Sequence, residues 1–195
     1  MRISELERKT KETDIKINLN LDGTGESNIE TGIGFLDHML TLFAFHSGID
    51  LNVKCNGDLN VDGHHTVEDL GILLGKSINQ ALSDKKGIMR YADCFMPMDE
   101  TLAHFSLDIS GRPYLVFNVS LSSERVGTFE TELTEEFFRA VAMNLMATMH
   151  INLEYGKNTH HIIEAIFKAC GRCIKQAVKI DKDNPNKILS SKGIL

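Results

Sequence analysis

No long apolar run and no cluster of basic residues occurs in this chain. Its 195 residues include 21 Lys and Arg against 27 Asp and Glu, which gives a formal net charge of −6. Because proteins that bind nucleic acids concentrate positive charge against the phosphates, this balance argues against a nucleic-acid partner. No apolar stretch approaches the length of a membrane-spanning helix, so we expect no membrane partner. Residues 1–11 are mostly polar and charged, and we therefore expect no signal peptide.

Cysteine is scarce and widely spaced, with four residues at Cys55, Cys94, Cys170 and Cys173. This is not the dense cysteine framework of a small secreted domain. Cys170 and Cys173 lie within one helical pattern, which favours packing over redox chemistry. A chain of this length with 42% hydrophobic residues can bury a proper core, as one domain or as two fused halves. Together these features predict a cytoplasmic enzyme subunit.

One pattern occurs twice in the chain, as His64-His65-x-x-Glu68 and His160-His161-x-x-Glu164. The likeness extends along the segments 64–82 and 160–178, which share seven identities in nineteen aligned positions. Chance would give about one, so the chain contains an internal repeat. Besides the His and Glu residues, the identical pairs are Gly75/Gly171, Ile78/Ile174, Gln80/Gln176 and Ala81/Ala177.

The doubled His-His-x-x-Glu pattern predicts a site for two metal ions. In each copy the apolar residues form a helical stripe that faces a core, and the His and Glu side chains fall outside it. His64 and Glu68 lie one turn apart and can bind one ion together, whereas His65 points about 100° away and suits a different ion. A single such pair is more often polar surface, but two matched copies favour metal binding. Outward-facing ligands need a second surface, which either the other repeat or another subunit could supply.

The order of strand and helix patterns is similar in two halves of the chain. The predicted helices are 34–46, 64–84, 133–148 and 160–180, and the predicted strands are 13–21, 50–55, 102–109, 113–121 and 150–154. Asp62, and either Asn158 or Thr159, are the candidate N-caps of the two ligand helices. The predicted fold is therefore α+β, with one sheet-plus-helix half in residues 1–90 and a second in residues 91–195.

Several basic and hydroxyl side chains could bind an anion beside the metals. Arg90, Arg112, Lys168 and the Ser190–Gly193 segment carry donors that match phosphate oxygens. Taken singly, each is more typical of a solvated surface.

The motifs GIGFLDHML (32–40), DGHHTVED (62–69), ISGRPY (109–114), GKNTHHIIEAIFK (156–168) and SSKG (190–193) resemble those of the monofunctional imidazoleglycerol-phosphate dehydratases. The resemblance covers essentially the whole chain. It implies dehydration of imidazole-glycerol phosphate to imidazole-acetol phosphate in histidine biosynthesis, with two Mn²⁺ ions per active site. It also implies two homologous halves of the left-handed β-α-β type (ribosomal protein S5 domain 2-like) and a homo-oligomer, a 24-mer with active sites between subunits.

The resemblance also implies roles for individual residues. The metal ligands would be His38, His64, His65, Glu68, His160, His161 and Glu164. Substrate-binding positions would be Glu12, His46, Arg90, Arg112, Lys168, Ser190 and Lys192, with the last two in a C-terminal substrate-binding tail. Glu12 is the first choice for the catalytic acid/base, with Glu68 and Glu164 in reserve.

The chain departs from the family at one expected ligand. Where a His commonly precedes a Phe-Phe pair, this chain has Glu136. A carboxylate is a good ligand for Mn²⁺, so we expect Glu136 to bind or approach one ion. The alternatives are a water in its place, recruitment of His150, or an exposed Glu136 without a role.

Two other functions fit the same pattern. A different dinuclear enzyme, such as a hydrolase of phosphorylated metabolites, would hold its ions about 3.5–4 Å apart. A metal-storage or scaffold protein would use the His pairs to join subunits and would take up metal without turnover.

Overall fold

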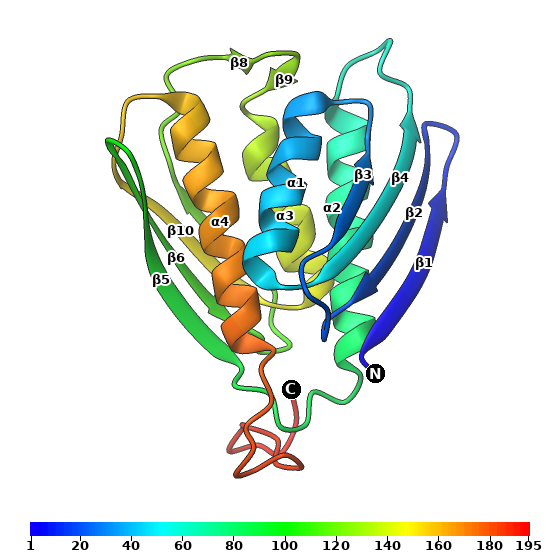
Figure 1. Ribbon diagram of the computed structural model, residues 1–195, viewed down its shortest axis with the longest axis vertical. Helices are drawn as coiled ribbons and strands as arrows, with labels where there is room; N and C mark the ends of the chain where they lie inside the picture. Colours follow the sequence, from blue (N-terminus) through cyan, green and yellow to red (C-terminus); the bar gives the residue numbers. More distant parts are fainter.

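Two four-stranded sheets enclose a layer of four helices, in a computed structural model that describes residues 1–195 (Figure 1). The first half of the chain contains β1 (Ile3–Lys9), β2 (Thr13–Asn20), β3 (Ser27–Glu30), α1 (Gly34–Ser47), β4 (Asp50–Gly57) and α2 (His64–Leu82). The second half contains β5 (Tyr91–Met98), β6 (Thr101–Asp108), β7 (Tyr114–Asn118), β8 (Arg125–Val126), β9 (Phe129–Glu130), α3 (Leu133–Leu145), β10 (Thr148–Tyr155) and α4 (Thr159–Ala177). The predicted α+β class with two sheet-plus-helix halves is confirmed.

The two sheets have the same topology. Their strand orders are β1-β2-β4-β3 and β5-β6-β10-β7, so each half places its first, second, fourth and third long strands side by side. The last pair in each sheet, β3 with β4 and β7 with β10, is parallel, and the other pairs are antiparallel. Each parallel pair is joined through a helix, α1 or α3. The β8-β9 hairpin is an addition found only in the second half.

The helices pack across the boundary between the halves. α2 lies on β1 and β2, and α4 lies on β5 and β6, but α1 packs against α4 and α3 packs against α2. One cluster of 47 buried apolar residues runs through both halves. The division into halves at residues 1–90 and 91–195 stays a prediction. It describes the sequence repeat and not two separate domains, because both halves share a single core.

The structure corrects the ends of several predicted elements and adds strands that the sequence pattern did not predict. The helix predicted over 64–84 ends at Leu82, and the helix predicted over 160–180 ends at Ala177. The helix predicted to reach residue 148 ends at Leu145, because Met146 adopts a left-handed conformation with φ of 60° and terminates it. The strand predicted over 113–121 covers only Tyr114–Asn118. β1 and β5 are edge strands, and the sequence pattern did not predict them. Their outward-facing residues include charged and aromatic side chains, which obscure the alternation of apolar and polar residues typical of a strand. No helix is both long and apolar enough to span a membrane.

Two glycines from the repeat lie where the paired helices approach closely. A Cβ on Gly75 of α2 would lie 2.7 Å from the Val141 carbonyl oxygen of α3. A Cβ on Gly171 of α4 would lie 2.8 Å from the Phe43 carbonyl oxygen of α1. The identity at these two positions therefore reflects the same close contact in both helix pairs.

We expect Gly75→Ala and Gly171→Ala each to destabilise the protein. Forcing backbone apart in a packed interface costs about 1–3 kcal/mol, which exceeds the ~1 kcal/mol that Ala gains over Gly in a helix. The free energy of unfolding, from denaturant titration, measures the effect. Gly34→Ala is the control, because a Cβ there would meet nothing within 4 Å. Wild-type stability in the two buried variants would contradict the close packing.

Candidate metal and substrate site

One group of three potential ligands forms between α1 and α4. The Glu164 Oε2 atom lies 3.2 Å from His160 Nε2 on the same helix and 3.5 Å from His38 Nε2 on α1. The ligand atoms of all three residues lie within 4.8 Å of one another, close enough to hold one metal ion. Glu164 is only 7% exposed, whereas the His38 side chain is exposed to solvent. The two halves of the chain thus both contribute to this group.

The second carboxylate oxygen of Glu164 belongs to an ion pair. Lys168 Nζ, one turn further along α4, lies 2.5 Å from Glu164 Oε1. Burial acts to raise the pKa of Glu164, but the Lys168 ammonium and the imidazoles of His38 and His160 outweigh it and leave that pKa lowered. Glu164 is therefore an ionised carboxylate that faces two imidazoles.

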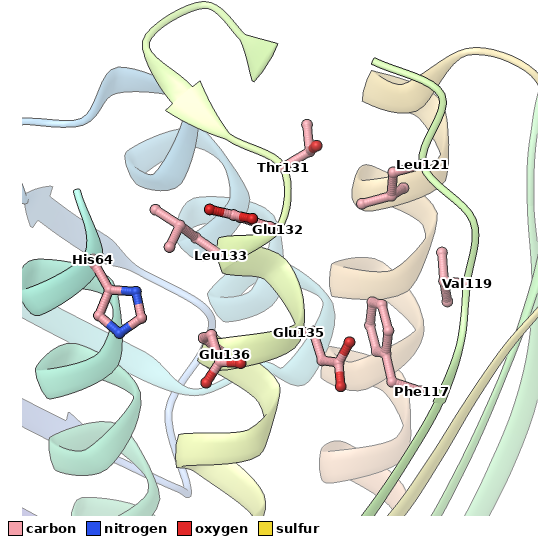
Figure 2. Close-up of a pocket in the computed structure, with 9 residues that line it drawn as sticks. All are labelled: His64, Phe117, Val119, Leu121, Thr131, Glu132, Leu133, Glu135 and Glu136. Atoms are coloured by element: carbon pink, nitrogen blue, oxygen red, sulfur yellow. The ribbon is translucent and has the colours of Figure 1, made fainter. Parts of the chain in front are cut away.

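The repeat-related residues lie between α2 and α3, but their ligand atoms do not form such a close group. His64 Nε2 is 3.9 Å from Glu68 Oε2, one turn along α2. Figure 2 shows His64 and Glu136, from facing helices, on the wall of one cavity of about 540 Å³. The Glu136 Oε2 atom lies 3.7 Å from Arg139 Nε, so the side chain is held loosely on its own helix. His150 lines a different cavity with His104 on the outer side of the second sheet.

The second His of each pair contacts acidic side chains from outside its helix. His65 Nδ1 lies 3.0 Å from Asp58 Oδ2, and its Nε2 lies 3.9 Å from Glu12 Oε1. His161 Nδ1 lies 2.7 Å from Glu100 Oε2, and its Nε2 lies 3.8 Å from Asp99 Oδ2. Hydrogen bonding to Asp58 raises the pKa of His65, and hydrogen bonding to Glu100 raises the pKa of His161.

The starts of the two ligand helices are fixed by side chains just upstream. Asn158 is the N-cap of α4, and its Oδ1 accepts from the backbone N–H groups of His160 and His161. Thr159, the alternative, is the first helical residue. For α2 the cap residue is Gly63, but Asp62 Oδ1 accepts from the His64 N–H at 2.8 Å. Both upstream side chains therefore orient a His pair in a first helical turn.

Arg90, Arg112 and the Ser190–Gly193 segment lie at the other end of the helices, whereas Lys168, the remaining predicted phosphate-binding residue, lies beside Glu164. Arg90 donates from its backbone to Ala177 O, at the last residue of α4, and from its Nη1 to Leu189 O at 2.6 Å. Arg90 and Arg112 both approach Asp108, at 2.7 and 3.8 Å. The Leu189 contact brings the segment with Ser190 and Lys192 to this end, where Figure 1 shows the C-terminus.

His46 lies apart from both groups, at the last turn of α1. It borders a cavity of about 690 Å³ with Arg172 and Lys175 of α4. Burial lowers the pKa of His46, and the nearby positive charges of Lys168 and Arg172 lower it further. The buried positions of Cys170 and Cys173 in α4 agree with the packing role predicted for them.

Comparison with known proteins gives one consistent result. The family model described as imidazoleglycerol-phosphate dehydratase matches residues 31–174. Among curated relatives, imidazoleglycerol-phosphate dehydratases of an Exiguobacterium strain and of Acetivibrio thermocellus are each 58% identical to this chain. The alignments cover 99% and 98% of this chain and 98% and 97% of those proteins.

Two crystal structures with the same description share the fold. The enzyme of Staphylococcus aureus superposes with a TM-score of 0.84 at 51% identity, covering 92% of this chain and 99% of that one. The enzyme of Pyrococcus furiosus superposes with a TM-score of 0.84 at 37% identity, covering 97% of this chain and all of that one.

Proposed function

This chain belongs to the imidazoleglycerol-phosphate dehydratase family, and on that premise we propose that it is a manganese enzyme whose His and Glu side chains bind two metal ions beside the substrate. Membership makes it a lyase that performs the dehydration step of histidine biosynthesis. The observation that carries the metal proposal is the close group of His38, His160 and Glu164.

The side chains in this group suit a divalent metal ion. Imidazole nitrogens and carboxylate oxygens are the ligands that Mn²⁺, iron and zinc accept, and the carboxylates favour Mn²⁺ among them. Glu164 is buried, ionised and directed at two imidazoles, as a ligand would be. We assign the remaining ligands to His64, Glu68 and Glu136 on the α2–α3 side, and to His65 and His161.

Glu136 takes the place of the usual His in this proposal. Its support is the cavity that Glu136 shares with His64, across the facing helices α2 and α3. His150 is the weaker substitute, because it lies in a separate cavity. A metal-bound structure in which Glu136 faces solvent would contradict this assignment.

The chemistry requires a proton acceptor and charge stabilisation. In the product the ketone lies on the carbon next to the ring-bearing carbon. The hydroxyl therefore leaves the ring-bearing carbon, and a proton leaves the neighbouring carbon. The hydroxyl and the proton together form water. Neither bond breaks readily, and bound metal ions supply Lewis-acid stabilisation of charge on the imidazole ring. Glu12 takes the carbon-bound proton, and the resulting enol becomes the ketone when a proton is added to the ring-bearing carbon. Glu68 and Glu164 are the reserve candidates for proton transfer.

The phosphate group of the substrate would be held by basic and hydroxyl side chains. We assign Arg90, Arg112, Ser190 and Lys192 to this role from their shared end of the molecule, and His46 and Lys168 to the substrate region near α1 and α4. Such remote binding energy orients the reacting carbons.

The distance between these two sets of residues supports an active site made by more than one subunit. His160 is at the start of α4, and Arg90 is bonded to its last residue, Ala177. At a rise of about 1.5 Å per residue these ends lie roughly 26 Å apart, too far for one small substrate to bridge. We therefore propose that the phosphate-binding residues meet the metal ligands of a neighbouring subunit in a homo-oligomer, the 24-mer that the family resemblance implies.

Removal of metal tests the proposed function. We expect protein stripped with a chelator to lose dehydration of imidazole-glycerol phosphate, and to regain it when Mn²⁺ is added, because the ring charge then has its stabilising ions. Turnover is followed as product formation, with inorganic phosphate measured in parallel. Release of phosphate would instead favour a hydrolase, and metal uptake without turnover would favour a scaffold protein. Full activity of verified metal-free protein would contradict metal dependence.

A further inference from the structure

The turn between β5 and β6 presents an acidic residue to the second ligand pair. We propose that Glu100 is a positioning residue, which holds His161 by its Nδ1 atom so that Nε2 is directed to a metal ion. This inference rests on the metal-dependent function proposed above.

Glu100 joins the His161 ring to the chain that precedes α4. Its Oε2 lies 2.7 Å from His161 Nδ1. Its Oε1 accepts from the backbone N–H groups of Asn158, at 2.7 Å, and Lys157, at 3.1 Å. One carboxylate therefore fixes both the rotation of the imidazole ring and the position of the first turn of α4.

This contact decides which ring nitrogen can bind a metal. A carboxylate only accepts hydrogen bonds, so the neutral His161 ring that binds a metal must carry its proton on Nδ1 and leave the lone pair on Nε2. Histidine ligands of metal ions commonly have such a carboxylate on the far nitrogen, which fixes the tautomer and makes the ligand more basic. Nε2 of His161 faces a second carboxylate, Asp99, at 3.8 Å.

The first half of the molecule contains the same arrangement. Asp58 lies against Nδ1 of His65 at 3.0 Å, and Glu12 lies 3.9 Å from Nε2. Each second His therefore has one carboxylate on Nδ1 and another near Nε2. A chance surface ion pair would not be expected to occur at both copies of a repeat.

Glu100 also corresponds to Glu12 in the repeat. Each precedes a buried threonine that opens the second strand of its sheet, Thr13 in β2 and Thr101 in β6. The two acids nevertheless contact different ring nitrogens, because Glu12 is near Nε2 and Glu100 is bonded to Nδ1. Glu100 has both oxygens engaged by donors, which suits a fixed support and not a group that exchanges protons with substrate.

Binding of Mn²⁺ alone to metal-free protein tests this role. We expect Glu100→Gln to weaken Mn²⁺ binding by about 10–100-fold, the usual cost of losing such a partner. We expect kcat at saturating Mn²⁺ to recover much more than it would after loss of a catalytic group. Glu154→Gln, an exposed acid on β10 of the same half, is the matched control and should bind Mn²⁺ as the wild type does.

A second variant separates positioning from a purely structural role. In protein that already carries His161→Ala, adding Glu100→Gln should cause little further loss of Mn²⁺ affinity, because the ring that Glu100 supports is gone. Losses that simply add would overturn the proposal, as would wild-type affinity in Glu100→Gln alone. If wild-type protein itself bound no Mn²⁺, the proposed metal function would fail instead, and the two failures are thereby distinguished.

Discussion

Glu164→Gln is expected to lower kcat/KM by about three orders of magnitude or more and to reduce bound metal. Glu164 is the one residue that contacts both His38 and His160, and its charge is matched by Lys168. Metal ions supply several kcal/mol of charge stabilisation, and each 1.36 kcal/mol of lost stabilisation is about tenfold in rate. The amide of Gln keeps the size of the side chain but loses the negative charge that both the metal and Lys168 require.

The measurement pairs steady-state kinetics with the metal content per subunit. Glu154→Gln is again a suitable control, because that acid is exposed and has no ion-pair partner. Mn²⁺ well above the wild-type requirement should restore only part of the rate, since the altered ligand remains. A Glu164→Gln enzyme with wild-type metal content and rate would show that this group is not a metal centre.

Glu12→Gln is expected to lower kcat by about 10²–10⁴-fold, the usual contribution of a general acid or base. In contrast to Glu164→Gln, the bound metal should be unchanged. Glu12 lies in the β1–β2 turn, 3.9 Å from His65 Nε2, and about half of its side chain is exposed. A proton carrier at this place can reach a substrate that lies against the metal ligands while remaining outside the ligand set.

The rate at saturating substrate is the quantity to compare, because the loss should fall on kcat and not on substrate binding. Glu7→Gln on β1 is the control, since that exposed acid pairs only with Lys16 at the surface. If Glu12→Gln kept most of its kcat, the acid/base assignment would be wrong, and Glu68 and Glu164 would be the next candidates.

The sequence predicted the parts of this site that repeat within a single helix. The His64 and His160 motifs stand out because an apolar stripe defines each helix and the ligands fall outside it. In the structure α1, from the other half of the chain, brings His38 to Glu164. The cross-packing of the halves explains why one repeat alone does not form this group.

Other residues could not be found from local patterns. His38, Asp58 and Glu100 come from a helix, a loop and a strand turn that the fold brings to the ligand helices. Glu12 looks like an ordinary solvated charge, and only the family resemblance indicates a role for His38. The one local signal for Glu100 is the repeat of Glu12-Thr13 as Glu100-Thr101, since each Glu directly precedes the threonine that opens the second strand of a sheet.

The pairing of α1 with α4 also determines when the metal site can form in a newly made chain. His38 emerges from the ribosome early, but its partners lie on the last helix. Contacts between segments so far apart in sequence form late, because the chain between them must first lose conformational entropy. Until α4 is complete, α1 packs on β3 but lacks its main helix partner, and the uncovered apolar side chains are prone to aggregation. The group proposed to bind metal can therefore form only after nearly the whole polypeptide has been made.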